Sequence, residues 1–154
     1  MKHIASILCS LCIFFSASTA QADPLNLAQY QGKQAVYLDF WASWCVPCRE
    51  SFPWLNLMQS RYGSRGLKII AVNLDNDPDA ASDFLAEYPA YFDIVFDPNG
   101  ELASRYDIQG MPSSVLIDKQ GNIFRQHVGF HGDKSAFYED IIKRLLSEGY
   151  ADAL

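Results

Sequence analysis

Two cysteines three positions apart, Cys45 and Cys48, have the clearest capacity for chemistry. An apolar, β-forming run ends at Trp41 and a helical pattern begins at Val46, so Cys45 is expected at a helix N-terminus. There, free backbone N–H groups and the helix dipole lower a cysteine pKa from ~8.5 to between ~3.5 and ~7.5. Cys48, one turn further on, can attack a mixed disulfide formed at Cys45. The pair indicates thiol–disulfide exchange, and Pro47 stiffens the approach of the two sulfurs.

One acidic residue, Asp39, interrupts the apolar run six residues before Cys45. An ionised carboxylate inside a dry strand is costly without a partner. Neighbouring backbone or Lys68 could supply a hydrogen bond, which would make the residue purely structural. We favour the interpretation that desolvation raises the pKa of Asp39, so that it exchanges a proton with Cys48 as that thiol becomes nucleophilic.

Two tryptophans flank the cysteine pair, and core packing could explain both of them. We expect Trp41, inside the apolar run, to lie in the core. Trp44 is adjacent to Cys45 and is expected at the site, where its ring would give a partner a flat apolar surface.

Two further groups have the spacing of metal ligands. Asp75, Asp77 and Asp79 resemble the opening of a calcium-binding EF-hand loop, but its glycine and closing glutamate are absent, so a helix cap is preferred. His127 and His131 have the spacing of helical metal ligands, yet His127 falls in a predicted strand. We expect neither a metal nor an organic cofactor.

The elements that would position these residues alternate along the chain. Strands are expected at 35–41, 67–74, 93–97, 113–119 and 122–130, and helices at 46–62, 78–88, 101–106 and 133–147. The last two strands read as a hairpin, and the final helix is expected to bury Phe137, Ile141 and Leu145. This order predicts an α/β sandwich with a mixed sheet.

The N-terminal segment, residues 1–22, is expected to be a secretory signal peptide. A basic start precedes an apolar run at 4–17 and an Ala-x-Ala pattern just before Asp23. The run falls short of the ~20 apolar residues that span a bilayer, so an uncleaved anchor is the less favoured alternative. Residues 23–154 would then form one domain, in the periplasm or secreted.

Two of the four cysteines, Cys9 and Cys12, would leave with the signal peptide. A bridge between the remaining Cys45 and Cys48 closes almost no loop and stabilises little, so its presence in an oxidising compartment needs a chemical reason. The alternatives are a buried pair of free thiols or half of a metal site.

Composition excludes several classes of protein. The chain has 154 residues, 49% of them hydrophobic, enough for the core of one globular domain. Its 12 Lys and Arg against 18 Asp and Glu give a net charge of -6, with no basic run. Nucleic acid is therefore not an expected partner.

The segment from Phe40 to Cys48 resembles the active-site segment of the thioredoxin superfamily, most closely that of its exported TlpA/ResA-like branch. Residues 49–53, the strand 70–75 and an insertion at 80–97 support this branch, and the resemblance covers about 35–130. It implies a thioredoxin-like three-layer sandwich, with a mixed central sheet flanked by helices and an insertion before a cis-proline.

The same resemblance identifies Met111-Pro112 as the cis-proline element, although a cis bond occurs at only ~5% of X-Pro sequences in general. It implies that the backbone of Met111 is offered to an extended substrate. The substrate-binding residues expected are Trp44, Pro47, Met111 and Pro112.

The chain departs from the branch at two positions. Ser51 stands where many ResA-like proteins carry a glutamate near the cysteines, and Asp39 matches the buried acid of thioredoxin, which ResA-like relatives often replace by an uncharged residue. Proton handling is therefore expected to follow thioredoxin.

The function predicted is that of an exported, monomeric protein-disulfide reductase, in which Cys45 attacks, Cys48 resolves and Asp39 relays the proton. By resemblance, it reduces disulfides of exported proteins with electrons from a membrane-bound donor. A thiol oxidase or isomerase of the same fold would differ in reduction potential. A copper metallochaperone could use both cysteines and a histidine for Cu(I), but related copper proteins usually have C-x-x-x-C spacing.

Overall fold

The computed structural model of the chain describes residues 25–151, so the predicted signal peptide lies outside the described residues. In chain order, the elements are the 3-10 helix η1 (Leu27–Tyr30), β1 (Ala35–Trp41), α1 (Val46–Tyr62), the 3-10 helix η2 (Gly63–Arg65), β2 (Leu67–Asn73), α2 (Pro78–Glu87), β3 (Asp93–Phe96), α3 (Glu101–Arg105), β4 (Ser113–Ile117), β5 (Ile123–Val128), the 3-10 helix η3 (Gly132–Lys134) and α4 (Ser135–Ala151). No helix within residues 25–151 combines the length and the apolar character that crossing a membrane requires.

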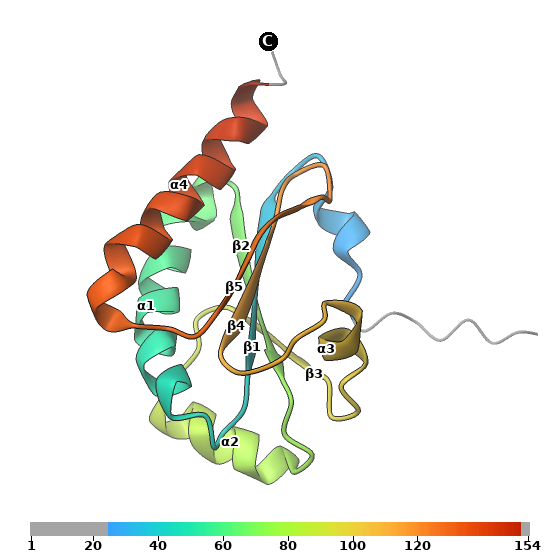
Figure 1. Cartoon of the computed structure of the whole chain (residues 1–154), viewed down its shortest axis with the longest axis vertical. Coiled ribbons are helices and arrows are strands. Elements are labelled where there is room, and N and C mark those ends of the chain that lie inside the picture. The colour runs from blue at the N-terminus through green and yellow to red at the C-terminus, as the bar shows by residue number, and fades with distance from the viewer. Residues whose placement is uncertain (1–24, 152–154) are drawn as a thin grey trace, which may run out of the picture.

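The strands form one mixed sheet in the order β3-β2-β1-β4-β5. β1 pairs in parallel with β2, and β2 with β3, whereas β4 runs antiparallel to both β1 and β5. Figure 1 shows α1 and α4 on one face of this sheet, and α3 with η1 on the other. The predicted three-layer α/β sandwich is confirmed.

The central strand β1 is buried on both faces, which explains its nearly continuous apolar sequence. Alternate residues point to opposite faces of a strand. Tyr37 and Trp41 join the core cluster beneath α1, α2 and α4, and Leu38 and Phe40 join a second cluster beneath η1 and α3. Asp39 lies between Tyr37 and Trp41 in this alternation, and so belongs to the α1/α4 face.

Helix α4 corrects one prediction. Ile141 and Leu145 are buried as expected, but Phe137 is 57% exposed, and the neighbouring Tyr138 is buried instead. A helix advances about 100° per residue, so positions four apart drift about 40° around the axis at each step. Over two steps this drift carries Phe137 out of the buried stripe.

The segment predicted as an insertion, residues 80–97, contains most of α2 and all of β3. β3 pairs only with β2 among the described strands and forms one edge of the sheet. At the start of α2, the Asp77 carboxylate accepts a hydrogen bond from the backbone N–H of Asp79 at 3.0 Å. The helix-cap interpretation of Asp77 is therefore confirmed.

Candidate redox site

The two cysteines lie where β1 leads into α1, and they form a disulfide with their Cα atoms 5.4 Å apart. Cys45 is the N-cap residue of α1, as predicted, and Pro47 stands in the first turn, where its missing N–H costs nothing. Cys45 is 3% exposed and Cys48 fully buried. Ser51 donates a hydrogen bond to the carbonyl oxygen of Cys48 at 3.1 Å, so the position of the branch's glutamate is neutral here.

The loop before Cys45 is held by the carboxylate of Asp75, for which the sequence predicted a helix cap instead. Asp75 accepts hydrogen bonds from the backbone N–H of Ser43 at 2.8 Å and from its hydroxyl at 2.9 Å. The side-chain amide of Asn73 donates a third, at 2.7 Å. The order of the strands could have indicated this contact. Because β1 and β2 are parallel, an acidic residue just after β2 lies at the same edge of the sheet as the loop after β1.

Asp39 is 1% exposed, and burial raises its pKa from 3.8 to about 7. A hydrogen bond of 3.0 Å, donated by the Ser114 hydroxyl to Oδ1, opposes this rise. Its other oxygen, Oδ2, has no hydrogen-bond partner among the described residues. Lys68, considered as a partner from the sequence, pairs instead with Asp93 at 2.6 Å.

The two tryptophans have different environments. Trp41 is fully buried, with its ring 4.9 Å from that of Phe52 and 4.7 Å from that of Phe84, which confirms it as a core residue. Trp44 is 67% exposed directly beside Cys45. Its ring is therefore available to a partner molecule.

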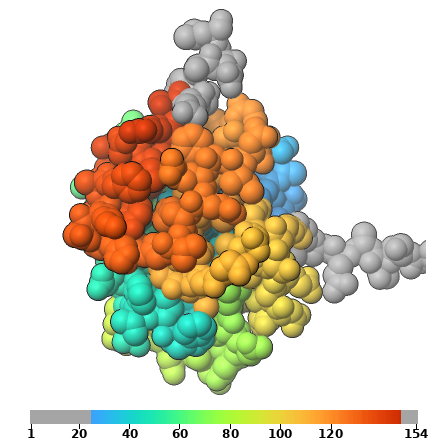
Figure 2. Space-filling model, viewed as in Figure 1, coloured from blue at the N-terminus to red at the C-terminus, as the bar shows by residue number. Residues whose placement is uncertain are grey.

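The loop before β4 reaches the same core cluster as the disulfide. The Met111–Pro112 peptide bond is cis, and the carbonyl oxygen of Pro112 accepts a hydrogen bond from Gly129 at 2.7 Å. Pro112 is buried, whereas Met111 is half-buried and packs against the cluster that contains Cys45 and Cys48. In Figure 2, this loop, in yellow-orange, adjoins the teal start of α1.

The two histidines do not come together as ligands. His127 is half-buried in β5, and its ring stacks on that of Tyr138 at 4.9 Å. Burial, and secondarily Arg125, lower its pKa to about 4, so it is neutral at pH 7. His131 precedes η3. In the part of the chain that the structure describes, no three His, Cys, Asp or Glu side chains are grouped as metal ligands.

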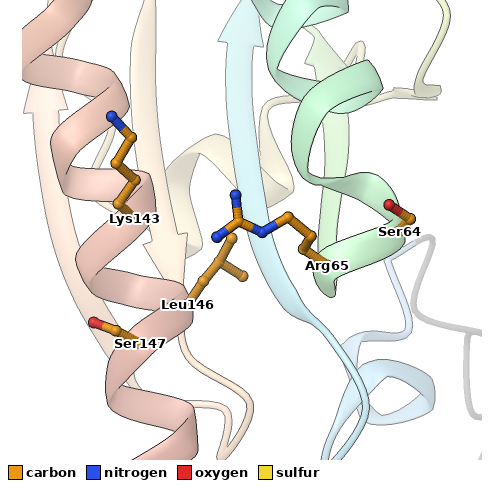
Figure 3. A pocket seen from close by; sticks show the side chains of 5 residues that line it. All are labelled: Ser64, Arg65, Lys143, Leu146 and Ser147. Atoms are coloured by element: carbon orange, nitrogen blue, oxygen red, sulfur yellow. The ribbon is translucent and has the colours of Figure 1, made fainter.

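A cavity of about 400 Å³ lies between η2, which follows α1, and α4 (Figure 3). The disulfide lies at the other end of α1. It is lined by Ser64, Arg65, Lys143, Leu146 and Ser147. The Arg65 side chain extends towards α4, and its guanidinium lies 5.0 Å from the centre of the Tyr62 ring. The lining includes neither cysteine nor Asp39, so this cavity is not part of the redox site.

Known proteins resemble the chain in sequence. Residues 14–142 match the Redoxin family model. Thiol-disulfide oxidoreductase ResA of Bacillus thuringiensis subsp. konkukian (strain 97-27) is 31% identical over 115 residues, which cover 75% of this chain and 66% of that protein. ResA of Oceanobacillus iheyensis is 35% identical over 99 residues, covering 64% and 51%. The chain thus spans between about half and two thirds of the length of these relatives.

Solved structures share the fold. A crystal structure from Chlorobium tepidum, described as a thiol:disulfide interchange protein DsbE, has 48% sequence identity and a TM-score of 0.75, covering 78% of this chain and 84% of that one. StoA from Bacillus subtilis has 28% identity and a TM-score of 0.62, covering 71% and 82%. The predicted thioredoxin-like fold is confirmed. The chain belongs to the Redoxin family, as a thioredoxin-like protein of the thiol–disulfide oxidoreductase type whose cysteine pair is Cys45–Cys48.

Proposed function

We propose that this protein exchanges electrons with disulfides of exported proteins, and that its direction is reduction. The observation that carries the proposal is the Cys45–Cys48 disulfide at the N-terminus of α1, on the sheet face that also holds the buried acid Asp39. A bridge across three positions adds little stability, so its use is chemical.

Cys45 is the nucleophile of the reduced protein. Its sulfur lies at the positive end of the α1 dipole, which favours the thiolate. The Cys45 thiolate attacks one sulfur of a partner disulfide and forms a mixed disulfide. The other partner sulfur leaves as a thiolate and takes a proton from water.

Cys48 completes the exchange. Its thiol gives a proton to the Asp39 carboxylate and attacks the sulfur of Cys45, and the bond between Cys45 and the partner breaks. The second partner sulfur leaves as a thiolate. The partner disulfide has then gained two electrons and the Cys45–Cys48 pair has lost two. A pKa of about 7 suits Asp39 to both taking and returning this proton near neutral pH.

Exposed surface around the disulfide supports a role in substrate binding for Trp44 and Pro47, and we propose that Met111 and the buried Pro112 contribute through the backbone of their loop. Trp44 and Pro47 are exposed on either side of Cys45, and Val46 between them is 63% exposed, which the sequence did not single out. An extended substrate segment would lie on this apolar rim and along the backbone of Met111.

Export rests on the sequence pattern of residues 1–22, which we propose are cleaved to release the domain 23–154 into the periplasm or the medium. We propose that this domain acts as a monomer and receives electrons from a membrane-bound donor. Mass spectrometry of the protein recovered outside the cytoplasm tests cleavage, since a chain that keeps Met1 and stays with the membrane contradicts it.

A trapping experiment tests the catalytic roles. Reduced wild-type protein should accelerate reduction of insulin disulfides by a thiol reductant, and Cys45→Ser should lose this activity. Cys48→Ser should accumulate a mixed disulfide with the substrate, visible by mass spectrometry as a thiol-sensitive adduct on Cys45. Equal rates for wild type and both variants would contradict the proposal.

Direction is tested by the reduction potential of the pair, measured by alkylation after equilibration in defined thiol buffers. A value near ~-270 mV or below supports a reductase, and one near ~-120 mV indicates an oxidant.

A further inference from the structure

Three polar residues lie side by side across the sheet. In the strand register, Asp39 of β1 is opposite Ser114 of β4, and Ser114 is opposite His127 of β5. Directly paired residues share a face of the sheet, so all three lie on the face that α1 and α4 cover. Tyr37 lies two residues before Asp39 on that face and reaches into the same row.

Hydrogen bonds join these residues into one chain. Ser114 donates its hydroxyl proton to Asp39 Oδ1 at 3.0 Å, and Tyr37 donates its own to the hydroxyl oxygen of Ser114 at 2.9 Å. A phenol has one proton to give, so the 3.4 Å contact between the Tyr37 oxygen and His127 Nε2 requires His127 to donate. The direction runs from His127 through Tyr37 and Ser114 to Asp39.

Most of this hydrogen-bonded row is buried. Tyr37 and Asp39 are each 1% exposed and Ser114 is 4% exposed. Two ionisable groups act on these residues from neighbouring positions: Tyr138 of α4, whose ring stacks on that of His127, and Arg125 of β5, whose charge acts on His127. On the other side of β1, Asp39 is opposite Ala71 of β2, which carries no charge. In a buried environment, where the dielectric constant is low, each hydrogen bond has a large effect on the electrostatics of the group that it contacts.

At each end of this series of hydrogen bonds lies a buried polar atom that has no hydrogen-bond partner among the described residues. These atoms are Oδ2 of Asp39 and Nδ1 of His127. Oδ2 is thus free to receive a proton while Oδ1 is held by Ser114. A core that needed only to be stable would fill these positions with apolar side chains.

We infer that Tyr37, Ser114 and His127 are positioning residues for Asp39: their hydrogen-bonded chain holds its carboxyl group ready for the proton of Cys48 and transmits a change in its protonation to the histidine of the edge strand β5. This inference rests on the proposed function, in which Cys48 gives that proton to Asp39. When Oδ2 takes the proton, Oδ1 becomes a weaker acceptor, and the bonds from Ser114, Tyr37 and His127 weaken in turn.

The test is an NMR titration of the oxidised protein with ¹³C-labelled aspartate and ¹⁵N-labelled histidine. Asp39→Asn assigns the carboxyl signal. In the wild type, the ring nitrogens of His127 should shift at the same pH as the Asp39 carboxyl. Ser114→Ala should raise the pKa of Asp39 by about one unit, because the hydrogen bond to the carboxylate is lost, and Ser114→Thr, which keeps the hydroxyl, should restore it.

Tyr37→Phe should abolish the shift of His127 at the Asp39 midpoint, and it provides a second reading should Ser114→Ala fail to fold. Tyr138→Phe is the matched control, because it keeps the ring that stacks on His127 and removes a hydroxyl that lies outside the hydrogen-bonded row. In this variant His127 should still shift at the Asp39 midpoint, and the pKa of Asp39 should stay within a few tenths of a unit of the wild-type value. An unchanged pKa of Asp39 in Ser114→Ala, or a His127 shift that persists in Tyr37→Phe, would overturn the inference. Neither reading uses a substrate, so an inactive wild-type protein would contradict the proposed function separately.

Discussion

The two faces of the sheet receive very different residues from the same strand. Towards η1 and α3, β1 presents Val36, Leu38 and Phe40, all apolar and buried. Towards α1 and α4 it presents Tyr37 and Asp39, whose polar atoms are equally buried. The first face contributes stability through burial alone, whereas the second gives up part of that stability to bury an ionisable group.

Leu38→Asn should produce the largest effect, because it brings a polar group to the apolar face. The variant loses a fully buried leucine side chain and buries an amide where the neighbouring residues offer no hydrogen bond. These two losses together should lower the free energy of unfolding by about 4–5 kcal/mol. Urea denaturation at pH 7 measures it. A loss below about 1 kcal/mol would mean that the two faces tolerate polar groups alike.

Asp39→Asn, at the next residue of β1, should raise the free energy of unfolding above pH 7, whereas Leu38→Asn lowers it. Because the folded pKa of Asp39 is raised from 3.8 to about 7, the unfolded chain releases this proton at lower pH than the native one. Wild-type stability therefore falls as the pH rises from about 4 to about 7, and the loss is complete above pH 7. A rise of about three pKa units corresponds to about 4 kcal/mol at most.

The Asp39→Asn variant carries no ionisable group at position 39, and the amide oxygen of the asparagine can still accept the hydrogen bond from the Ser114 hydroxyl. It should match the wild type near pH 4 and exceed it by up to about 4 kcal/mol at pH 8. Urea denaturation of both proteins between these pH values measures the difference. Stability curves that run parallel with pH would show that Asp39 is not held neutral by burial.

Much of the fold follows from local patterns in the sequence. The run Ala35–Trp41 is apolar on both faces, and α1 buries Phe52, Leu55 and Met58 at helical spacing, so these elements could be predicted from periodicity. The error at Phe137 arose because a four-residue spacing approximates the helical period only over a short distance.

Some residues of the candidate site could likewise be predicted from the sequence, and others could not. The cysteine pair and the buried acid could be predicted, because a reactive residue type in an unsuitable environment is visible in the sequence. The hydrogen-bond partners Ser114 and Asp75 could not be predicted. Ser114 contacts Asp39 because of the register of β1 and β4, and Asp75 contacts Ser43 because the segments after β2 and β1 lie side by side. Serines and aspartates of ordinary appearance acquire these contacts only when distant segments come together.

Asp75→Ala should have an intermediate effect, and it tests whether the loop beside the disulfide depends on β2. The variant removes the acceptor of two hydrogen bonds from Ser43 and one from Asn73. A loss of about 2–3 kcal/mol is expected in thermal or urea unfolding. Asp77→Ala is the control, because it removes only the cap of α2 and should cost about 1 kcal/mol. Equal losses in the two variants would contradict a special role for Asp75.

The smallest effect is expected at Phe137, and it tests which side of α4 covers the sheet. Phe137 is 57% exposed whereas Ile141, one turn on, is 5% exposed. Phe137→Ser should change the free energy of unfolding by less than about 0.5 kcal/mol, the usual range for surface positions. Ile141→Ala should cost about 2–4 kcal/mol, because it leaves a cavity between α4 and the core cluster. If Phe137→Ser were the more destabilising of the two, α4 would have to be rotated about its axis, and the stacking of Tyr138 on His127 would be lost with it.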